Sequence, residues 1–347
     1  MKKLVTGWAL LAAILLVAGL AGCEGDQGPA GPPGTASCMG CHTDQFDSEL
    51  ATFLKPYQTQ FSFSKHGTGD TYERNSASCA RCHTSEGFQH FVNTGEAIEV
   101  PGSSQIHCFT CHAPHTTENF SVRVTSAVAL DVGGTYDKGT SNVCATCHQA
   151  RVPSPAIAGG GEASGRWGPH HGPQSNLLTG QGFYSFDGSD YPNDAGHNSI
   201  STGCVNCHMA EPMGPLVGGH SFWLHEEGDE AINVNGCGCH GTWDEESAHE
   251  RVHDVQTEFE EKLEMLVQDM AALGWVNPES ASGFVIRQTF TEQQLGAIWN
   301  YLMLKEDLSG SVHNPITANA VLEATQAFVD AQSGSSSLAS FDNMKTK

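Results

Sequence analysis

The sequence predicts a mainly α, loop-rich fold that ends in a C-terminal bundle of long helices. The stretch from residue 37 to residue 243 is rich in Gly, Ser, Thr, Asn and Pro and has few periodic apolar runs. Such a stretch buries little core with its own side chains. From residue 244 to residue 332 apolar residues instead recur every three or four positions, which is typical of amphipathic helices. We therefore expect two structured parts with these bounds.

Five C-x-x-C-H runs mark the first part. Their residues are Cys38, Cys41 and His42; Cys79, Cys82 and His83; Cys108, Cys111 and His112; Cys144, Cys147 and His148; and Cys204, Cys207 and His208. Two cysteines at this spacing can each form a thioether with one vinyl group of a haem, and the next histidine then becomes the proximal iron ligand. Zinc sites and redox-active C-x-x-C pairs do not require that histidine. The runs predict five c-type haems.

A sixth site is irregular. The run Cys237-Gly-Cys239-His240 has one residue fewer between its cysteines, so both sulfurs cannot reach both vinyl groups in the usual way. A single thioether from Cys239, with His240 on the iron, is one interpretation. A local disulfide or a weak metal site is the other. Its position at the end of the haem motifs favours a sixth haem.

Haem could also form the hydrophobic core that the motif region lacks. Porphyrins would supply the apolar surface that residues 37–243 lack, so we expect a haem-cored domain whose folding depends on its cofactor.

The histidines outnumber the motifs. Six of the 18 histidines follow a motif cysteine, which leaves twelve for the opposite faces of the haems. Histidine on both faces gives a six-coordinate iron of low potential, whereas methionine raises the potential. Histidines in short loops beside the motifs are the favoured distal ligands, and of the adjacent His170 and His171 only one is expected to bind iron. These candidates are His66, His115, His170, His171, His197 and His220. Further candidates are His107, His249, His253 and His313, while His90 and His225 are not expected to bind iron.

The N-terminus resembles an export signal. Lys2 and Lys3 precede an apolar run over residues 8–20, which is too short to span a bilayer. Leu20-Ala-Gly-Cys23 resembles the lipobox of bacterial lipoproteins, and Cys23 is the one cysteine outside the six candidate haem sites. We predict a signal peptide over residues 1–22 and a lipid on Cys23. The alternative is an ordinary cleavage site near an unmodified cysteine.

A short tether follows. Residues 23–36 contain a Gly-x-y tract too brief for a collagen triple helix, and a semi-extended linker is expected. The protein would then be lipid-anchored in the bacterial cell envelope, at the outer membrane, on its periplasmic face or at the cell surface.

The second part predicts three helices. Apolar residues from Val252 to Leu273 form one stripe, and Gly274 is placed to end that helix. Thr291-x-x-Gln294 resembles a capping box that starts the second helix. Asn314-Pro315 predicts an N-cap and first turn of a third helix, which would run to about Ala331. The tail over residues 333–347 is expected to be disordered.

The net negative charge of the chain limits which macromolecules it is expected to bind. The chain has 39 acidic and 16 basic residues, a net charge of −23, and loss of Lys2 and Lys3 would make it about −25. Nucleic acid and anionic lipid surfaces are poor partners for such a body, whereas basic cytochromes would be steered towards it. Solubility alone is an equal explanation. The long helix could also form the seam of a homodimer.

Six segments of the chain occur together in one known family. They are Ser64-Lys-His66, Cys108 to His115, Trp167-Gly-Pro-His170-His171-Gly-Pro, Cys204 to Met209, Gly218-Gly-His220-Ser-Phe and Ser309-Gly-Ser-Val-His313-Asn-Pro315. On these segments the chain resembles the large multihaem family that includes ammonia-forming nitrite reductases, octahaem hydroxylamine oxidoreductases and tetrathionate reductases, and their electron-transfer relatives. The resemblance covers most of the chain from Cys38 to Val329.

Two departures from the family matter for function. Nitrite reductases of this family carry a lysine in place of the motif histidine at the catalytic haem, and no C-x-x-C-K run occurs here. The octahaem enzymes hold more haems than this chain can attach. The resemblance therefore implies the family architecture without a retained active site. Lipoprotein cytochromes that carry electrons across or outside the envelope of metal- or sulfur-reducing bacteria look similar in layout.

The sequence thus predicts an electron carrier rather than an enzyme. Electrons would pass along stacked bis-histidine haems in respiratory or extracellular electron transfer, with no catalytic residue. The alternative is a reductase of a small nitrogen or sulfur oxyanion with one open haem, for which His170, His171 and Tyr184 are the acid–base candidates. A filament subunit that shares ligands between protomers is a third hypothesis.

Overall fold

The computed structural model describes residues 46–117, 119–193, 196–225, 232–241, 243–280 and 283–334. The expected signal peptide, the tether, the lipidation site Cys23, the first haem motif with Cys38, Cys41 and His42, and residues 335–347 lie outside these ranges. From Asp47 onward the chain folds into one compact unit. Within the described ranges, no helix combines the length and the apolar character needed to cross a bilayer.

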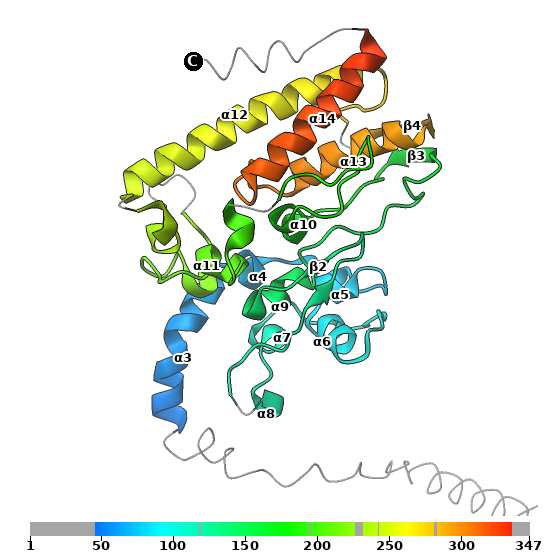
Figure 1. Cartoon of the computed structure of the whole chain (residues 1–347). Coiled ribbons are helices and arrows are strands. Elements are labelled where there is room, and N and C mark those ends of the chain that lie inside the picture. The colour runs from blue at the N-terminus through cyan, green and yellow to red at the C-terminus, as the bar shows by residue number, and fades with distance from the viewer. Residues whose placement is uncertain are drawn as a thin grey trace, which may run out of the picture. The chain divides into compact units, whose positions relative to one another are not determined.

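The expected mainly α, loop-rich class is confirmed (Figure 1). The part that carries the haem motifs has one longer helix, α3 (Phe46–Phe63), and otherwise short helices joined by irregular chain. These are α4 (Lys65–Thr68), η1 (Thr71–Glu73), α5 (Ala80–His83), α6 (Ser85–Thr94), α7 (Cys108–Cys111), α8 (Pro114–Thr117), η2 (Gly139–Ser141), α9 (Asn142–Ala145), α10 (Gln174–Thr179), η3 (Gly196–Ser199), α11 (Cys204–His208), η4 (Gly219–Ser221), η5 (Val234–Gly236) and η6 (Gly238–His240).

Three long helices follow, as the sequence predicts: α12 (Glu245–Ala272), α13 (Glu292–Glu306) and α14 (Pro315–Ser333). The side chain of Asp244 caps α12, which starts earlier than the apolar stripe indicates, and Gly274 follows its end with φ +74°. The expected capping box of Thr291 and the expected N-cap Asn314 are both present, so these starts are confirmed. Local capping chemistry thus fixes where the helices begin and end.

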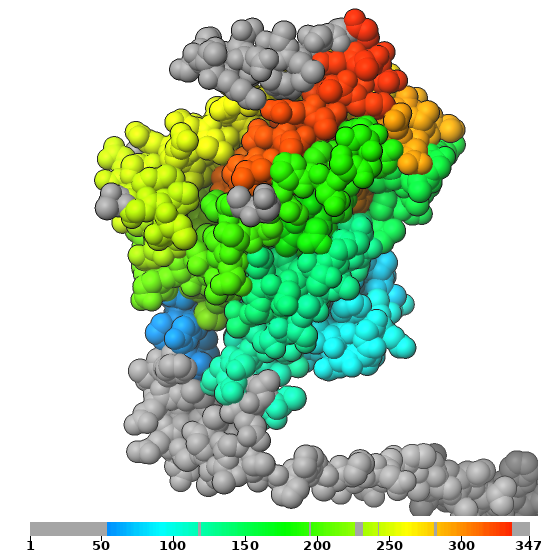
Figure 2. All heavy atoms as spheres, in the orientation of Figure 1, coloured from blue at the N-terminus to red at the C-terminus, as the bar shows by residue number. Residues whose placement is uncertain are grey.

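The helices α12, α13 and α14 pack side by side and enclose the main core (Figure 1). Leu266, Trp299 and Leu322 are buried there. The segment from about residue 150 to residue 191 lies against these helices and adds Trp167 and Leu177 to the same core (Figure 2). The C-terminal helices are therefore a platform onto which part of the motif region is fixed.

Two small antiparallel sheets complete the fold. Strand β1 (Val128–Ala129) pairs with β2 (Thr135–Tyr136), and β3 (Gly161–Gly165) pairs with β4 (Val285–Phe290). The second sheet ties the middle of the chain to the segment before α13. No local pattern in the sequence predicts this pairing, because its partners are far apart along the chain.

The motif region has few buried apolar side chains of its own. Among the described residues between 54 and 125, the buried apolar residues are Ala80, Phe88 and Ala113. Large aromatic residues of the same region, such as Phe63 and Phe109, are 46% and 49% exposed. This distribution agrees with a region that needs an additional apolar group for its core.

Candidate functional site

Each regular haem motif that the structure describes lies at a helical turn. Helices α7 and α11 begin at Cys108 and Cys204, Cys79 is the N-cap of α5, and α9 contains Cys144. A turn of helix brings residues three apart onto one side, which is what two thioethers to one haem require. None of the ten cysteines in the described ranges is in a disulfide, so all ten thiols are available.

Every motif histidine in the described chain faces a second histidine at nearly the same distance. The ring centroids are 6.1 Å apart for His83 and His170, 6.1 Å for His112 and His220, 6.0 Å for His148 and His66, 6.1 Å for His208 and His313, and 5.9 Å for His240 and His197. An imidazole nitrogen binds a transition metal at about 2 Å and its ring centre lies roughly 1 Å further away, so two such rings on one metal are separated by about 6 Å. The spacing fits one iron between each pair.

The Nδ1 atoms of most paired histidines are already engaged. The contacts are His112 with the Phe120 carbonyl (2.6 Å), His208 with the Phe222 carbonyl (2.9 Å), His197 with the Val312 carbonyl (2.5 Å), His313 with Asp307 Oδ1 (2.7 Å), His148 with Gln174 Oε1 (3.2 Å) and His83 with the Thr71 hydroxyl (3.0 Å). Carbonyl and carboxylate oxygens only accept, so the ring nitrogen must donate. Where the partner is such an oxygen, Nε2 is left unprotonated and free to bind a metal, which is how protein imidazoles are oriented around metals.

Burial keeps several of these rings neutral, as ligation requires. Burial lowers the pKa of His66 to about 4, and the nearby His148 lowers it further. Burial likewise lowers the pKa of His170 to about 4, with Arg151 as the next cause. The pKa of His208 is also lowered, chiefly by burial. A neutral imidazole offers its lone pair to a metal without first losing a proton.

Backbone strain in the described chain is concentrated at the same place. Four non-glycine residues have positive φ there: His170 (+70°), Phe222 (+62°), Leu308 (+63°) and Ser311 (+78°). His170 is itself a paired histidine, and the carbonyl of Phe222 accepts from His208. The other two lie in the turn that leads to His313. Strain of this kind is kept where a function requires it, and here every instance adjoins a histidine pair.

Neighbouring pairs are linked through side chains. The Phe222 ring lies 5.2 Å from the ring of His66 and 6.0 Å from that of His220, so it joins two pairs. A hydrogen bond to Cys147 is the main cause that lowers the pKa of Cys82, which brings the second and fourth motifs into contact.

The fourth, fifth and irregular motifs are also in contact with one another in turn. A hydrogen bond from Cys144 is the main cause that lowers the pKa of Cys204 to about 6, so the fourth and fifth motifs touch. The Asn206 amide donates to the Gly236 carbonyl at 2.9 Å, next to the irregular site. Named by their motif histidines, the pairs follow the order His83, His148, His208, His240, with His112 beside His148.

The irregular site has the same arrangement as the others. His240 faces His197, and its other neighbour is Trp243, whose ring is stacked on it at 4.2 Å with an interplanar angle of 12°. Cys239 is exposed and Cys237 half-buried, on the two adjoining 3₁₀ turns. A histidine pair is therefore present even where the cysteine spacing is short.

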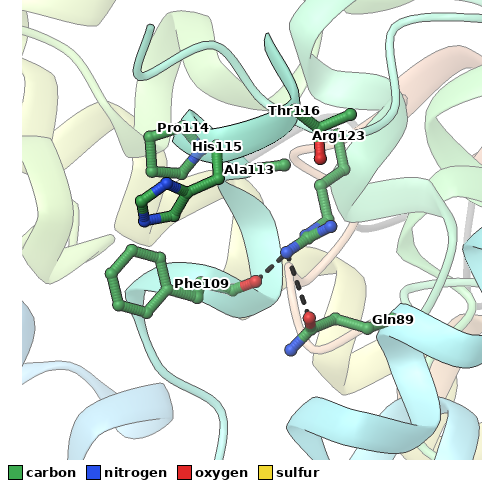
Figure 3. Close-up of a pocket in the computed structure, with 7 residues that line it drawn as sticks. All are labelled: Gln89, Phe109, Ala113, Pro114, His115, Thr116 and Arg123. Atoms are coloured by element: carbon green, nitrogen blue, oxygen red, sulfur yellow. Dashed lines mark hydrogen bonds between the residues drawn. The ribbon is translucent and has the colours of Figure 1, made fainter. Parts of the chain in front are cut away.

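Some residues proposed from the sequence have other neighbours. His171 is 67% exposed and its Nδ1 lies 2.6 Å from Glu306 Oε2. His115 lines a cavity of about 260 Å³ beside Phe109 and Arg123 (Figure 3). Tyr184, an acid–base candidate, lies against α13 with its hydroxyl 3.3 Å from Glu292 Oε1.

His313 is more closely associated with a haem motif in the structure than the sequence predicts. The sequence ranks His313 among the secondary candidates, whereas its ring lies opposite that of His208. Its buried neighbour Asp307 is not singled out by the sequence at all. The signal that points to both is their position in the short connection between two strongly predicted helices.

No family model and no curated protein matches the sequence. Among solved structures, the chain is similar to the crystal structure of the outer cell wall cytochrome OcwA, with a TM-score of 0.53 and 19% identity. The match covers 78% of this chain and 49% of that chain, so the chain spans about half the length of OcwA. The undecahaem cytochrome from the S-layer of Carboxydothermus ferrireducens matches with a TM-score of 0.45 and 16% identity, over 80% of this chain and 40% of that chain.

The similarity is one of fold. The described chain has a fold of the multihaem cytochrome kind. The more specific resemblance to nitrite reductases and hydroxylamine oxidoreductases stays a prediction from the sequence.

Proposed function

We propose that this protein is a multihaem c-type cytochrome that transfers electrons along a series of bis-histidine haems. The observation that carries the proposal is that all five described motif histidines face a second histidine at 5.9–6.1 Å. In this proposal the motif cysteines attach the porphyrins, and the hydrogen bonds at Nδ1 hold the rings in position. The haems, when bound, supply one-electron chemistry.

The contacts between motifs support a route. The order His83, His148, His208 and His240 gives a line of four sites, with His112 as a branch at His148. Cysteine side chains of neighbouring motifs touch, so haems attached to them would approach each other closely at their edges. A protein that passes electrons needs such spacing more than it needs acid–base groups.

The number of haems is part of the proposal. Five motifs lie in the described ranges, and Cys38, Cys41 and His42 form a further motif outside them, which gives six haems. One of the six would be held by a single thioether at Cys239.

The same geometry favours the carrier over the reductase. A reductase of this kind binds its substrate at an open coordination position on iron. Two histidines at each described site would both bind the iron, which would leave no place for nitrite or hydroxylamine there. The candidate Tyr184 meets Glu292 on α13 instead of a histidine pair.

The location and the partners follow from sequence and composition. We place the protein in the cell envelope, with a lipid anchor on Cys23 at the outer membrane. The structural match is named an outer cell wall cytochrome, which agrees with an envelope location. The net charge of −23 favours basic redox partners.

Electron transfer can be tested by stopped flow with the purified, fully reduced holoprotein. Mixed with an excess of a small basic cytochrome, it is expected to deliver one electron for each haem counted by intact mass. The rate should fall as salt is added, because salt screens the attraction between opposite charges.

An uncharged mediator is the control, and its rate should change little with salt. Fewer electrons than haems would show that some sites are disconnected from the route. Steady turnover of nitrite, hydroxylamine or tetrathionate would contradict the carrier and support the reductase.

A further inference from the structure

Asp307 occupies an unusual position next to one histidine pair. It directly follows α13, its side chain is 0% exposed, and its Oδ1 lies 2.7 Å from His313 Nδ1. Oδ2 accepts from the backbone N–H of Ser309 at 3.2 Å and from the Ser309 hydroxyl. Among the described residues it forms no ion pair with a lysine or an arginine. The carboxylate is thus held by hydrogen bonds, and one of these comes from a candidate haem ligand.

Five other paired histidines have a neutral partner at Nδ1. These partners are the carbonyls of Phe120, Phe222 and Val312, the side-chain amide of Gln174 and the hydroxyl of Thr71. Among the Nδ1 partners of the paired histidines in the described chain, Asp307 is the one anion. Hydrogen bonds to a carboxylate are stronger than those to a neutral oxygen, and burial removes the water that would weaken them.

An anionic acceptor changes what the imidazole does at the metal. It draws the Nδ1 proton towards itself, which makes the ring a stronger electron donor at Nε2. A stronger donor stabilises the oxidised iron more than the reduced iron, so the potential falls. A buried negative charge near the iron acts in the same direction, because reduction removes one positive charge from the site.

The local backbone holds this contact in place. Leu308 and Ser311 both have positive φ, so the turn between Asp307 and His313 is tightly bent. Asn314 then caps α14 through Thr317 N–H. The segment is fixed at both ends by long helices, which keeps the carboxylate aligned on the ring.

We propose that Asp307 is a positioning residue that lowers the reduction potential of the haem held between His208 and His313. The inference rests on the proposed function, since it presupposes a haem at this pair. In the order of sites this haem lies between those of His148 and His240. Asp307 would therefore make this interior site of the line a less favourable place for an electron to remain.

The test is a spectroelectrochemical titration of the holoprotein and its variants. Asp307→Asn keeps the size and one acceptor oxygen but removes the charge. One component of the titration is expected to shift upward by at least a tenfold change in its reduction equilibrium, which is about 59 mV for one electron. The other components should stay in place.

Glu306→Gln is the matched control. It removes the same charge from the adjacent residue, which contacts His171 instead of a paired histidine. It should shift the same component much less. In a His313→Met background, Asp307→Asn should cause a smaller shift, because a thioether has no N–H to donate and only the effect of the buried charge is left.

Two results would overturn the proposal. One is an Asp307→Asn protein with all reduction potentials unchanged, and the other is an equal shift in Glu306→Gln, which would show a general effect of charge.

If Asp307→Asn does not fold, the electron-spin spectrum of the wild-type protein tests the proposal. It should contain one low-spin species with the g-values of an anionic imidazole ligand, and neutral-imidazole signals alone would refute the role of Asp307. A high-spin haem or a missing haem at this pair would instead count against the proposed function.

Discussion

His170 and His171 are adjacent, yet they meet different groups. The ring of His170 lies 6.1 Å from that of His83, on a residue with φ +70°. His171 turns to Glu306 and is 67% exposed. The sequence proposes that one of the two binds iron without saying which, and the structure places His170 opposite the motif.

This difference predicts the outcome of two glycine substitutions. His170→Gly removes the ring while glycine readily adopts the positive φ, so the fold should survive. The haem at His83 is then expected to become five-coordinate, high-spin and able to bind carbon monoxide. His171→Gly should leave every haem low-spin.

Optical and electron-spin spectra of the two holoproteins make the comparison. If His171→Gly produces the high-spin haem and His170→Gly does not, the assignment is reversed. If neither variant does, the pair of His83 and His170 does not hold an iron.

At the level of single residues, local context predicts part of the site. The sequence places His66, His170, His197 and His220 in short segments near a motif, and each lies opposite a motif histidine in the structure. Their binding to iron remains a prediction. His313 could not be ranked in this way, because its approach to His208 depends on how the turn between α13 and α14 packs.

At the level of elements, the irregular site differs from the regular motifs. Cys237 is the residue between η5 and η6, and Cys239 lies within η6, so the two are not on one turn of α-helix. The two sulfurs therefore cannot present themselves to a haem as those of α7 or α11 can. The pair of His240 and His197 is nevertheless formed.

Intact mass of two serine variants separates the roles of these cysteines. Cys239→Ser is expected to lower the count from six covalent haems to five, because the only thioether at this site is lost. Cys237→Ser is the matched control and should keep six. Loss of a haem in Cys237→Ser alone would assign the bond to the other sulfur, and five haems in the wild type would contradict a haem at this site.

The longer elements could be predicted because their signals are local. Capping residues and an apolar stripe lie within a few positions of the helix ends they define, as at Thr291 and Asn314. The pairing of β3 with β4 and the links between cysteines of different motifs join distant parts of the chain. Such contacts depend on tertiary packing, so they cannot be predicted from a local sequence pattern.

At the level of the whole molecule, two kinds of core are combined. The C-terminal helices and residues around Trp167 bury a continuous set of apolar side chains. The motif region buries few, and its histidines face one another in pairs instead. Stability should therefore come from side-chain packing in one part and from haem in the other.

In the proposed function every haem is held between two histidines. The electron-spin and optical spectra of the oxidised and reduced holoprotein, with and without carbon monoxide, test this directly. We expect low-spin signals alone and a reduced spectrum that carbon monoxide does not change. A high-spin signal together with a carbon monoxide-sensitive haem in the wild-type protein would contradict it, because at least one iron would then have an open position.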